Sequence, residues 1–212
     1  MDLLITVLPA LLDGLKVTLK VFAISLVVSF PLGFVVALIR IYAPRVIGWI
    51  IQTYIFIMRG TPLLLQIMFV FFGLPFMGIR LERFDAALFA LILNYTAYIA
   101  EIARGGIQAI PKNQNEAIAV LGIGRVRGFI RIIIPQVIKI ILPALGNEVI
   151  SLVKDTSLIY IIGFSELLRA GQSAANQFAT PEPYIYVGVI YLMITAIITV
   201  ILNKLEARYK ED

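Results

Sequence analysis

Long runs of apolar residues, each about as long as a helix that crosses a lipid bilayer, dominate this chain. A helix rises 1.5 Å per residue, so about 20 apolar residues are needed to cross a hydrocarbon layer about 30 Å thick. With 60% hydrophobic and 15% charged residues among 212, the chain has more apolar surface than one soluble core can bury. The sequence therefore predicts a single all-α integral membrane domain over residues 1–212.

Hydropathy predicts about five transmembrane helices. The first two connections are short, so the first three helices are expected to be neighbours in space. Asp2 and Asp13 flank the first apolar stretch, where a cleaved signal peptide needs a basic start and a small-residue cleavage site. We therefore expect that the N-terminus is not a cleavable signal peptide. The predicted spans cover residues 15–39, 50–76, 86–103, 132–162 and 184–202.

The distribution of the 18 lysine and arginine residues predicts the orientation, because cytoplasmic loops of membrane proteins are enriched in both. Eleven of them lie in or beside the first and third connections and in the C-terminal tail, whereas five lie toward the opposite side. We therefore expect the N-terminus outside the cell and the C-terminus in the cytoplasm. The eleven are Arg40, Arg45, Arg104, Lys112, Arg125, Arg127, Arg131, Lys139, Lys204, Arg208 and Lys210.

Several kinds of chemistry are excluded by what the chain lacks. It contains no cysteine and no histidine, so disulfides, histidine-ligated metal sites and serine–histidine–aspartate triads cannot form. It also has no Gly-x-x-x-x-Gly-Lys-Ser/Thr phosphate loop, so it is not expected to bind ATP. We expect no catalytic site, no metal and no bound cofactor. The net charge of +5 follows from topology and does not predict nucleic-acid binding.

The connection between the third and fourth spans contains a short helix with a specific pattern. Pro111 suits a helix N-terminus because its missing N–H needs no partner there. Residues 112–121 then make about three turns, and Gly122 supplies a C-terminal stop. The pattern predicts a docking surface for a soluble partner; a helix that lies on anionic lipid is the alternative. The residues expected to form the surface are Glu116, Ala117, Val120, Leu121 and Gly122.

Residues 95–158 resemble permease subunits of ABC importers for polar amino acids, of the histidine, arginine and glutamine type. In those subunits a Glu-Ala…Gly…Ile-x-x-Pro element is the cytoplasmic coupling helix that docks on the ATPase, and an Arg-Gly-Thr-Pro-Leu element precedes several aromatic residues. The first element matches Glu116, Ala117, Gly122, Ile132 and Pro135. The second matches Arg59 to Leu63, followed by Phe69, Phe71 and Phe72. Another element of the family matches Lys154 to Leu158.

Three positions in or beside the coupling element depart from the family pattern. Asn113 stands where glycine is expected, Ile118 where a second alanine is usual, and Ile134 where leucine is common. We expect these changes to adjust the fit to the ATPase and none of them to remove the element.

The resemblance also implies partners and a location. It implies an ABC ATPase subunit that binds ATP and Mg²⁺, an extracytoplasmic amino-acid-binding protein, and a second permease subunit, either an identical copy or a close paralogue. The protein would then be a multi-pass component of a prokaryotic plasma membrane that imports a polar amino acid. Basic amino acids such as arginine, lysine or histidine are among the candidates.

Two other functions remain as alternatives at this point. One is a proton-coupled secondary amino-acid transporter, in which Glu101 and Asp155 carry protons. An odd number of spans without an obvious duplication argues against it, because many such transporters are built from paired repeats. The other is a membrane scaffold or receptor module without transport.

Polar residues inside the spans are candidates for substrate contact, because charged groups in a bilayer are costly. On the third span Asn94, Tyr98 and Glu101 share a face by i, i+4, i+7 spacing. Asn94 is expected to bind an α-carboxylate or α-amino group, and Glu101 either to bind a cationic group or to pair with Arg104. On the fourth span the candidates are Asp155, Thr156, Ser157 and Tyr160.

Other residues predict architecture. Pro62 removes one helix hydrogen bond, so the sequence around it predicts a kink in the second span. The 164–183 segment is expected to be a partly helical loop or gate, and the aromatic residues of 69–76 to face lipid or the core. Ser25, Ser29 and Gly33 give the first span a small face for helix packing. The hinge or structural residues are Arg59, Gly60, Thr61, Pro62 and Lys154.

Overall fold

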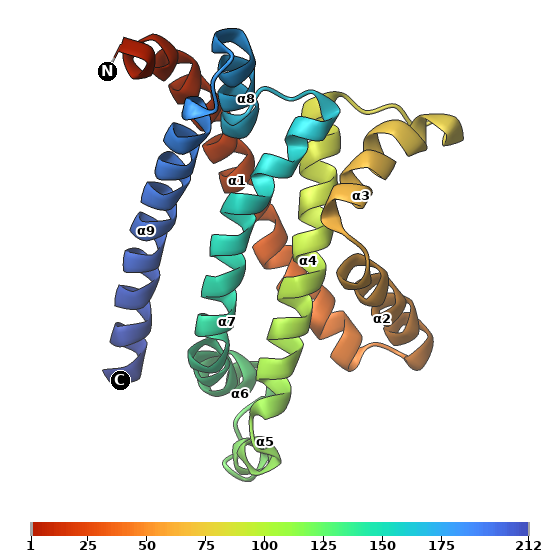
Figure 1. Ribbon diagram of the computed structural model, residues 1–212. Coiled ribbons are helices and arrows are strands. Elements are labelled where there is room, and N and C mark those ends of the chain that lie inside the picture. Colours follow the sequence, from red (N-terminus) through yellow and green to blue (C-terminus); the bar gives the residue numbers. More distant parts are fainter. Residues whose placement is uncertain (1, 212) are drawn as a thin grey trace.

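The computed structural model describes residues 2–211, and every regular element in that range is helical, as the sequence predicts (Figure 1). The long helices are α1 (Asp2–Tyr42), α4 (Arg83–Ala109), α7 (Ile134–Asp155) and α9 (Glu182–Glu211). The shorter ones are α2 (Arg45–Gly60), α3 (Leu63–Met68), α5 (Lys112–Val120), α6 (Arg125–Gly128) and α8 (Leu167–Phe178). Tighter or wider helical turns join them: η1 (Phe69–Gly73), η2 (Leu74–Met77), η3 (Phe129–Ile133) and η4 (Thr156–Ile162).

Within the described residues, four helical stretches are long and apolar enough to cross a membrane, and α2 with the helical turns up to Met77 makes a fifth. The two halves of this fifth stretch are bent by 107° at the break between Gly60 and Leu63. The predicted spans are confirmed. The predicted kink lies where Pro62 places it, although the bend is a full interruption of the helix. The four unbroken stretches are Leu3–Tyr42, Arg83–Ala109, Arg125–Ile162 and Glu182–Tyr209.

The first helix begins much earlier than the predicted span. α1 has 41 residues, which corresponds to a length of about 60 Å, or about twice the hydrocarbon thickness. Its first third packs against α8 and α9, where Val7 and Leu11 are buried with Leu167 and Val187. Hydropathy locates a segment as long as the bilayer is thick, and it does not reveal a helical extension that other parts of the chain bury.

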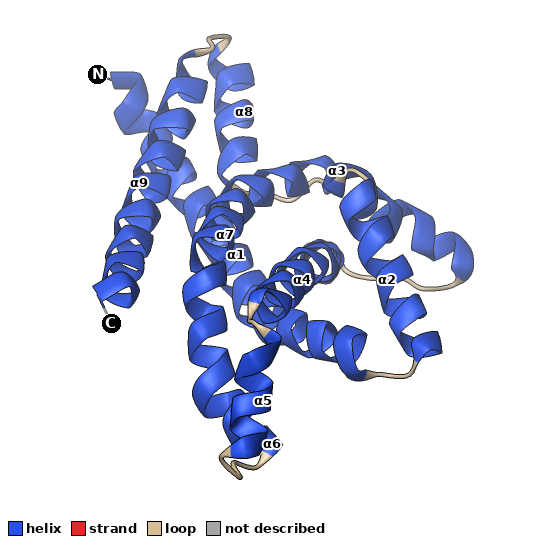
Figure 2. Cartoon of the chain, turned by 90° about the horizontal axis from the view of Figure 1, so that it is seen from below, coloured by secondary structure: helices blue, strands red, loops and turns tan. Residues whose placement is uncertain are grey.

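Helix α4 is the most buried of the spans and lies at the centre of the bundle, with α1, α2, α3 and α7 around it (Figure 2). Close helix crossings depend on glycine. A Cβ added to Gly33 of α1 would lie 2.5 Å from Ile99 of α4. Ser25 and Ser29 are fully buried on the same helix, so the predicted packing role of this small face is confirmed.

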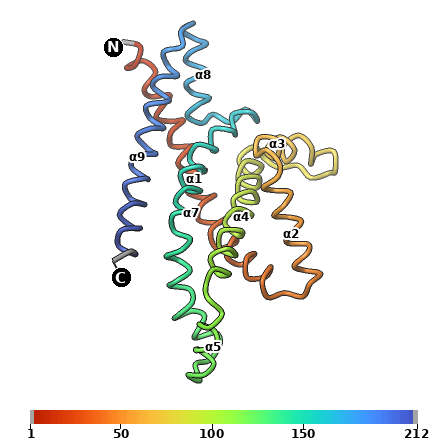
Figure 3. Tube along the Cα trace, turned by 60° about the horizontal axis from the view of Figure 1, so that its bottom comes forward, coloured from red at the N-terminus to blue at the C-terminus, as the bar shows by residue number. Residues whose placement is uncertain are grey.

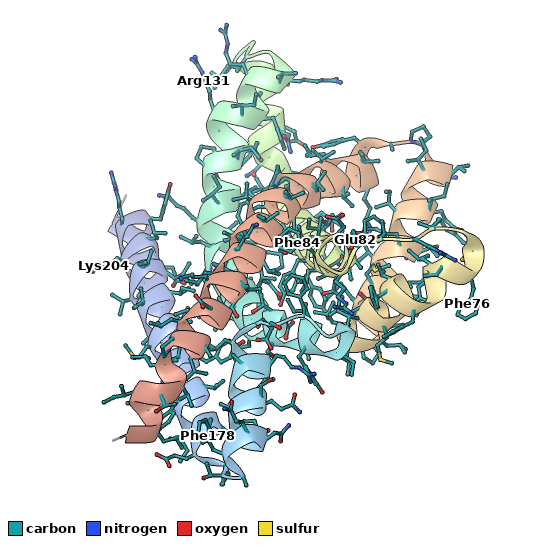
Figure 4. All side chains as sticks on the ribbon, turned by 90° about the horizontal axis from the view of Figure 1, so that it is seen from above. Phe76, Glu82, Phe84, Arg131, Phe178 and Lys204 are labelled. Carbon is teal, nitrogen blue, oxygen red and sulfur yellow. The ribbon has the colours of Figure 1, made fainter. Side chains whose placement is uncertain are left out.

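The two ends of the bundle carry different elements. The N-terminus and α8 lie at one end, whereas α5, α6 and the C-terminus lie at the other, and α5 projects beyond the long helices (Figures 1 and 3). Arg131 points away from the bundle at the α5–α6 end (Figure 4). The assignment of the α5 end to the cytoplasm, and of the two termini to opposite sides of the membrane, stays a prediction.

The 164–183 connection and the aromatic residues of 69–76 agree only in part with the expectations from the sequence. The 164–183 segment contains α8, so its helical character is confirmed. Among the aromatic residues, Phe71 packs against the central cluster, whereas the side chains of Phe69 and Phe72 are about half exposed. Phe76 is 93% exposed and lies at the edge of the molecule (Figure 4).

Candidate functional site

A polar pocket of about 680 Å³ lies beside the break between α2 and α3. Its walls come from the break, from the middle of α4 and from the last turns of α7. Two cations and two carboxylates line it, and charged groups within a membrane-spanning bundle are functional candidates by default. The lining residues are Arg59, Gly60, Thr61, Pro62, Leu63, Leu64, Asn94, Tyr95, Tyr98, Glu148, Ser151, Lys154, Asp155 and Leu158.

The pocket brings together some of the predicted substrate residues and leaves out others. Asn94, Tyr98 and Asp155 line it, together with the Arg59–Pro62 sequence that was expected to be structural. Thr156 is fully buried, and its hydroxyl donates a 2.6 Å hydrogen bond to the carbonyl oxygen of Val153. The remaining candidates outside the lining are Glu101, Ser157 and Tyr160.

The break between α2 and α3 is stabilised by two side-chain amides. Pro62 has no N–H, so the carbonyl of Met58, four residues earlier, loses its helical partner. That carbonyl accepts hydrogen bonds from Nδ2 of Asn94 at 3.0 Å and from Nε2 of Gln66 at 2.9 Å. Nδ2 of Asn94 also donates to Oε1 of Gln66 at 3.0 Å. The amide N–H groups of Asn94 therefore stabilise the break. Gln66, which does not line the pocket, is a residue of the break that the sequence analysis missed.

The two sides of the pocket differ in their contacts. The guanidinium of Arg59 lies over the ring of Tyr98, 5.3 Å from its centroid, which is a cation–π geometry. The hydroxyl of Tyr95 donates a 2.7 Å hydrogen bond to Oδ2 of Asp155. Nothing in the local sequence around Tyr95 indicates this contact, because its partner is 60 residues away. Lys154 is exposed and lines the same pocket.

Glu101 does not reach the pocket. Its carboxylate forms ion pairs with Arg104 on the same helix and with Arg40 at the end of α1. The three side chains are 18–24% exposed, so the cluster is half-buried. Pairing with Arg104 is the arrangement that the sequence offered as an alternative to substrate contact. Arg40 adds a second cation, which ties the ends of α1 and α4 together.

Helix α5 exposes the predicted docking surface. All five predicted residues are exposed, and the side chains of Val120 and Leu121 are 86% and 72% exposed. Gly122 has a φ of +68°, which suits glycine at a helix C-terminus. The exposure of these residues agrees with the predicted surface, and its role in docking a soluble partner stays a prediction.

Ile118 is the buried residue of α5, so its side chain contacts the rest of this chain, and its effect on the fit to an ATPase stays a prediction. It lies in a cluster with Ile133 and Val137, within the protein itself. A Cβ added to Gly128 would lie 2.5 Å from Cγ2 of Ile118. The extra bulk at this position therefore fastens α5 to the start of the α6–α7 segment.

Residues 29–211 match the family described as the binding-protein-dependent transport system inner membrane component. The chain belongs to this family. This permease is 39% identical over 207 residues to the arginine transport system permease protein ArtQ of Bacillus subtilis (strain 168), across 97% of its own length and 94% of the relative. It is 37% identical over 206 residues to the glutamine transport system permease protein GlnP of Escherichia coli (strain K12), across 96% and 94% of the two chains.

Solved structures agree with this assignment. A chain of an amino acid ABC transporter crystallised with histidines is 36% identical to this permease and superposes with a TM-score of 0.89, over 97% of this chain and 96% of the other. A chain of the MetNI methionine ABC transporter, at 17% identity and a TM-score of 0.73 over 99% and 97% of the two chains, shares the fold. The resemblance seen in the sequence is thereby confirmed, as is a multi-pass membrane protein that works with separate partner proteins.

Proposed function

We propose that this chain is the transmembrane subunit of an ABC importer that moves a polar amino acid into the cytoplasm. The observation that carries the proposal is the polar pocket, where Arg59 and Lys154 face the same space as Glu148 and Asp155. An amino acid carries a carboxylate and an ammonium group at neutral pH, so a pocket with both signs of charge complements it. The relatives named for arginine and glutamine transport support the same substrate class.

The roles follow from the chemistry of each side chain. The guanidinium of Arg59 and the ammonium of Lys154 suit an α-carboxylate, and Asp155, oriented by Tyr95, suits an ammonium. Glu148 then leaves a second carboxylate for a cationic side chain, which supports a basic amino acid as a candidate. The charges are spaced around about 680 Å³, which is within the usual range for small-ligand pockets.

Energy would come from a separate ATPase that binds ATP and Mg²⁺ and docks on α5 at the cytoplasmic end. Because Ile118 packs against Gly128, movement of α5 would pass into α7, whose last turns carry Ser151 and Asp155. Asn147 and Lys154 are exposed on α7 within the membrane-spanning region. Polar groups facing lipid are costly, which supports a second permease subunit opposite this face, with one pathway between the two. A binding protein would deliver substrate at the α8 end.

The test is uptake of radiolabelled L-arginine and L-glutamine into proteoliposomes that contain the permease with the ATPase and binding protein purified with it. We expect uptake that requires ATP and is lost with Gly122→Trp, because an indole side chain on the exposed turn blocks docking. Uptake that ignores ATP and collapses with the proton gradient would favour the proton-coupled alternative. Asp155→Asn is expected to weaken uptake at least tenfold, with the exposed Glu182→Gln as its control.

A further inference from the structure

A buried carboxylate lies outside the polar pocket and has no part in the proposed transport cycle. The side chain of Glu166 is fully buried at the start of α8, in the connection between α7 and α9. Its oxygens accept hydrogen bonds of 2.7 Å from the backbone N–H groups of Leu168 and Arg169, and one of 3.3 Å from the hydroxyl of Tyr191. No basic side chain pairs with it within residues 2–211. A fully buried glutamate without a cation is uncommon.

The surroundings make this carboxyl sensitive to protons near neutral pH. Burial raises the pKa of Glu166 to about 7, even though the hydrogen bonds from the backbone N–H groups act in the opposite direction. The titratable group that faces it is Tyr191 of α9. The charged side chains on the neighbouring elements have partners elsewhere: Arg169 donates to Gln172, Asp13 pairs with Lys16 in solvent, and Lys20 lies over Phe84.

Glu166 belongs to a hydrogen-bonded group that joins four elements. The backbone N–H of Leu167 donates to the hydroxyl of Thr18 on α1 at 3.2 Å. The hydroxyl of Tyr191 has Thr18 and Thr156 as hydrogen-bonding neighbours. Thr156 directly follows Asp155 of the polar pocket, and its own hydroxyl donates to the carbonyl of Val153 in the last turn of α7. Glu166, Tyr191 and Thr156 thus form one polar group beside the end of α7 that carries Asp155.

Protonation of Glu166 must rearrange this polar group. As a carboxylate, Glu166 accepts from two backbone N–H groups and from the Tyr191 hydroxyl. A protonated carboxyl has an O–H that needs an acceptor, and the backbone N–H groups cannot accept. The oxygen of Tyr191 is the acceptor within reach, so the Glu166–Tyr191 hydrogen bond reverses its direction. The Tyr191 hydroxyl then needs another acceptor, and its other hydrogen-bonding neighbours are the hydroxyls of Thr18 and Thr156.

We propose that Glu166 is a proton-responsive positioning residue, which links α8 through Tyr191 and Thr156 to the end of α7 and thereby sets the position of Asp155 in the pocket. The effect on substrate rests on the proposed function of that pocket; the structural linkage does not. If so, the hydrogen-exchange protection of residues 152–158 and the affinity of the pocket for its amino acid change together between pH 6 and pH 8.

The linkage can be tested by hydrogen–deuterium exchange on the assembled transporter in nanodiscs, between pH 5.5 and 8.5, after correction for the chemical exchange rate. In the wild type, we expect protection of residues 152–169 to change with a midpoint near pH 7. Glu166→Gln keeps an oxygen that can cap α8 but cannot ionise, so the change should disappear. With Tyr191→Phe the change should remain at residues 165–169 and no longer reach 152–158. A wild-type profile in Glu166→Gln, or no response at 152–158 in the wild type, overturns the proposal.

Binding of radiolabelled L-arginine at pH 6 and pH 8 tests the effect on the pocket. We expect the dissociation constant of the wild type to differ at least threefold between the two pH values, and that of Glu166→Gln by less than 1.5-fold. Glu182→Gln, on an exposed glutamate, should behave as the wild type. If arginine binds with the same pH ratio in Glu166→Gln, the positioning role fails and the proposed function stands. If neither arginine nor glutamine binds, the proposed function fails and the exchange measurement decides the linkage.

Discussion

Tyr95 donates a hydrogen bond of 2.7 Å from its hydroxyl to Oδ2 of Asp155, and this contact joins the centre of α4 to the last residue of α7. Both residues line the polar pocket. The bond holds the carboxylate of Asp155 in one orientation at a place where α7 changes into the η4 turn. A hydrogen bond to a charged group contributes about 1.5–3 kcal/mol, so Tyr95 has a measurable share in the geometry of the pocket.

Tyr95→Phe removes this donor and leaves the shape of the side chain almost unchanged. We expect the free energy of unfolding to fall by about 1.5–3 kcal/mol and the KM for uptake to rise roughly tenfold, because Asp155 loses its fixed orientation. Thermal unfolding in detergent and uptake in proteoliposomes measure the two effects. Tyr160→Phe is the matched control, since Tyr160 lies outside the pocket lining. An unchanged KM in Tyr95→Phe would mean that Asp155 does not depend on this contact.

Glu101 gives a prediction that follows from its pairing with Arg104, one of the two alternatives that the sequence left open. Because its carboxylate is paired with Arg40 and Arg104, Glu101→Gln should loosen the contact between α1 and α4 and not change selectivity. We expect uptake of L-arginine and of L-glutamine to fall by the same factor, roughly three- to tenfold. Asp155→Asn, inside the pocket, should instead alter the ratio of the two rates. A loss confined to arginine in Glu101→Gln would return Glu101 to the substrate pathway.

Much of the fold could be predicted because bilayer thickness and proline chemistry act locally. The spans follow from runs of apolar residues, and the break follows from Pro62, whose missing N–H acts four residues back on Met58. The angle of 107° could not be predicted, because the break is stabilised by Asn94, which comes from another helix. The early start of α1 was missed for the same reason: its first turns are buried by α8 and α9.

In the candidate site, too, the features that depend on nearby residues could be predicted, and those that depend on residues distant in the sequence could not. Helical spacing placed Asn94 and Tyr98 on one face, and both line the pocket. It also placed Glu101 there, although an arginine 61 residues earlier in the chain engages that carboxylate. The surface of α5 was predicted from its short local pattern. The burial of Ile118 depends on Gly128, which follows after a turn, and no periodicity within α5 reveals it.

The contact between Ile118 and Gly128 predicts a rescue experiment. Gly128→Ala places a methyl group against Cγ2 of Ile118 and should displace α5, so we expect a loss of ATP-driven uptake by at least fivefold. Adding Ile118→Ala, the residue usual in the family, removes the clash and should restore more than half of the uptake. Gly105→Ala is the control, because a Cβ there meets no atom within 4 Å.

Two measurements on Gly128→Ala and on the double variant distinguish a loss of coupling from a loss of folding. Equal unfolding temperatures with a raised ratio of ATP hydrolysed to substrate moved would show that α5 has lost its connection to α7. A double variant as inactive as Gly128→Ala would contradict the interlocking of the two residues. The single change Ile118→Ala should leave a cavity and lower the free energy of unfolding by about 2–5 kcal/mol, unless the helix settles into the space.

The carboxyl of Glu166 makes the stability of the permease depend on pH. Its pKa is about 7 in the folded protein, raised by burial from its ordinary value of 4.5, so folding favours the protonated form. This contribution is complete below pH 4.5 and is lost as the pH rises through 7. The difference in pKa corresponds to at most about 3 kcal/mol. Urea unfolding of the purified chain at pH 5 and pH 8 should therefore show a smaller difference for Glu166→Gln than for the wild type, with Glu182→Gln resembling the wild type. Parallel pH profiles in all three proteins would mean that Glu166 keeps its ordinary pKa, with water or a cation reaching the carboxylate.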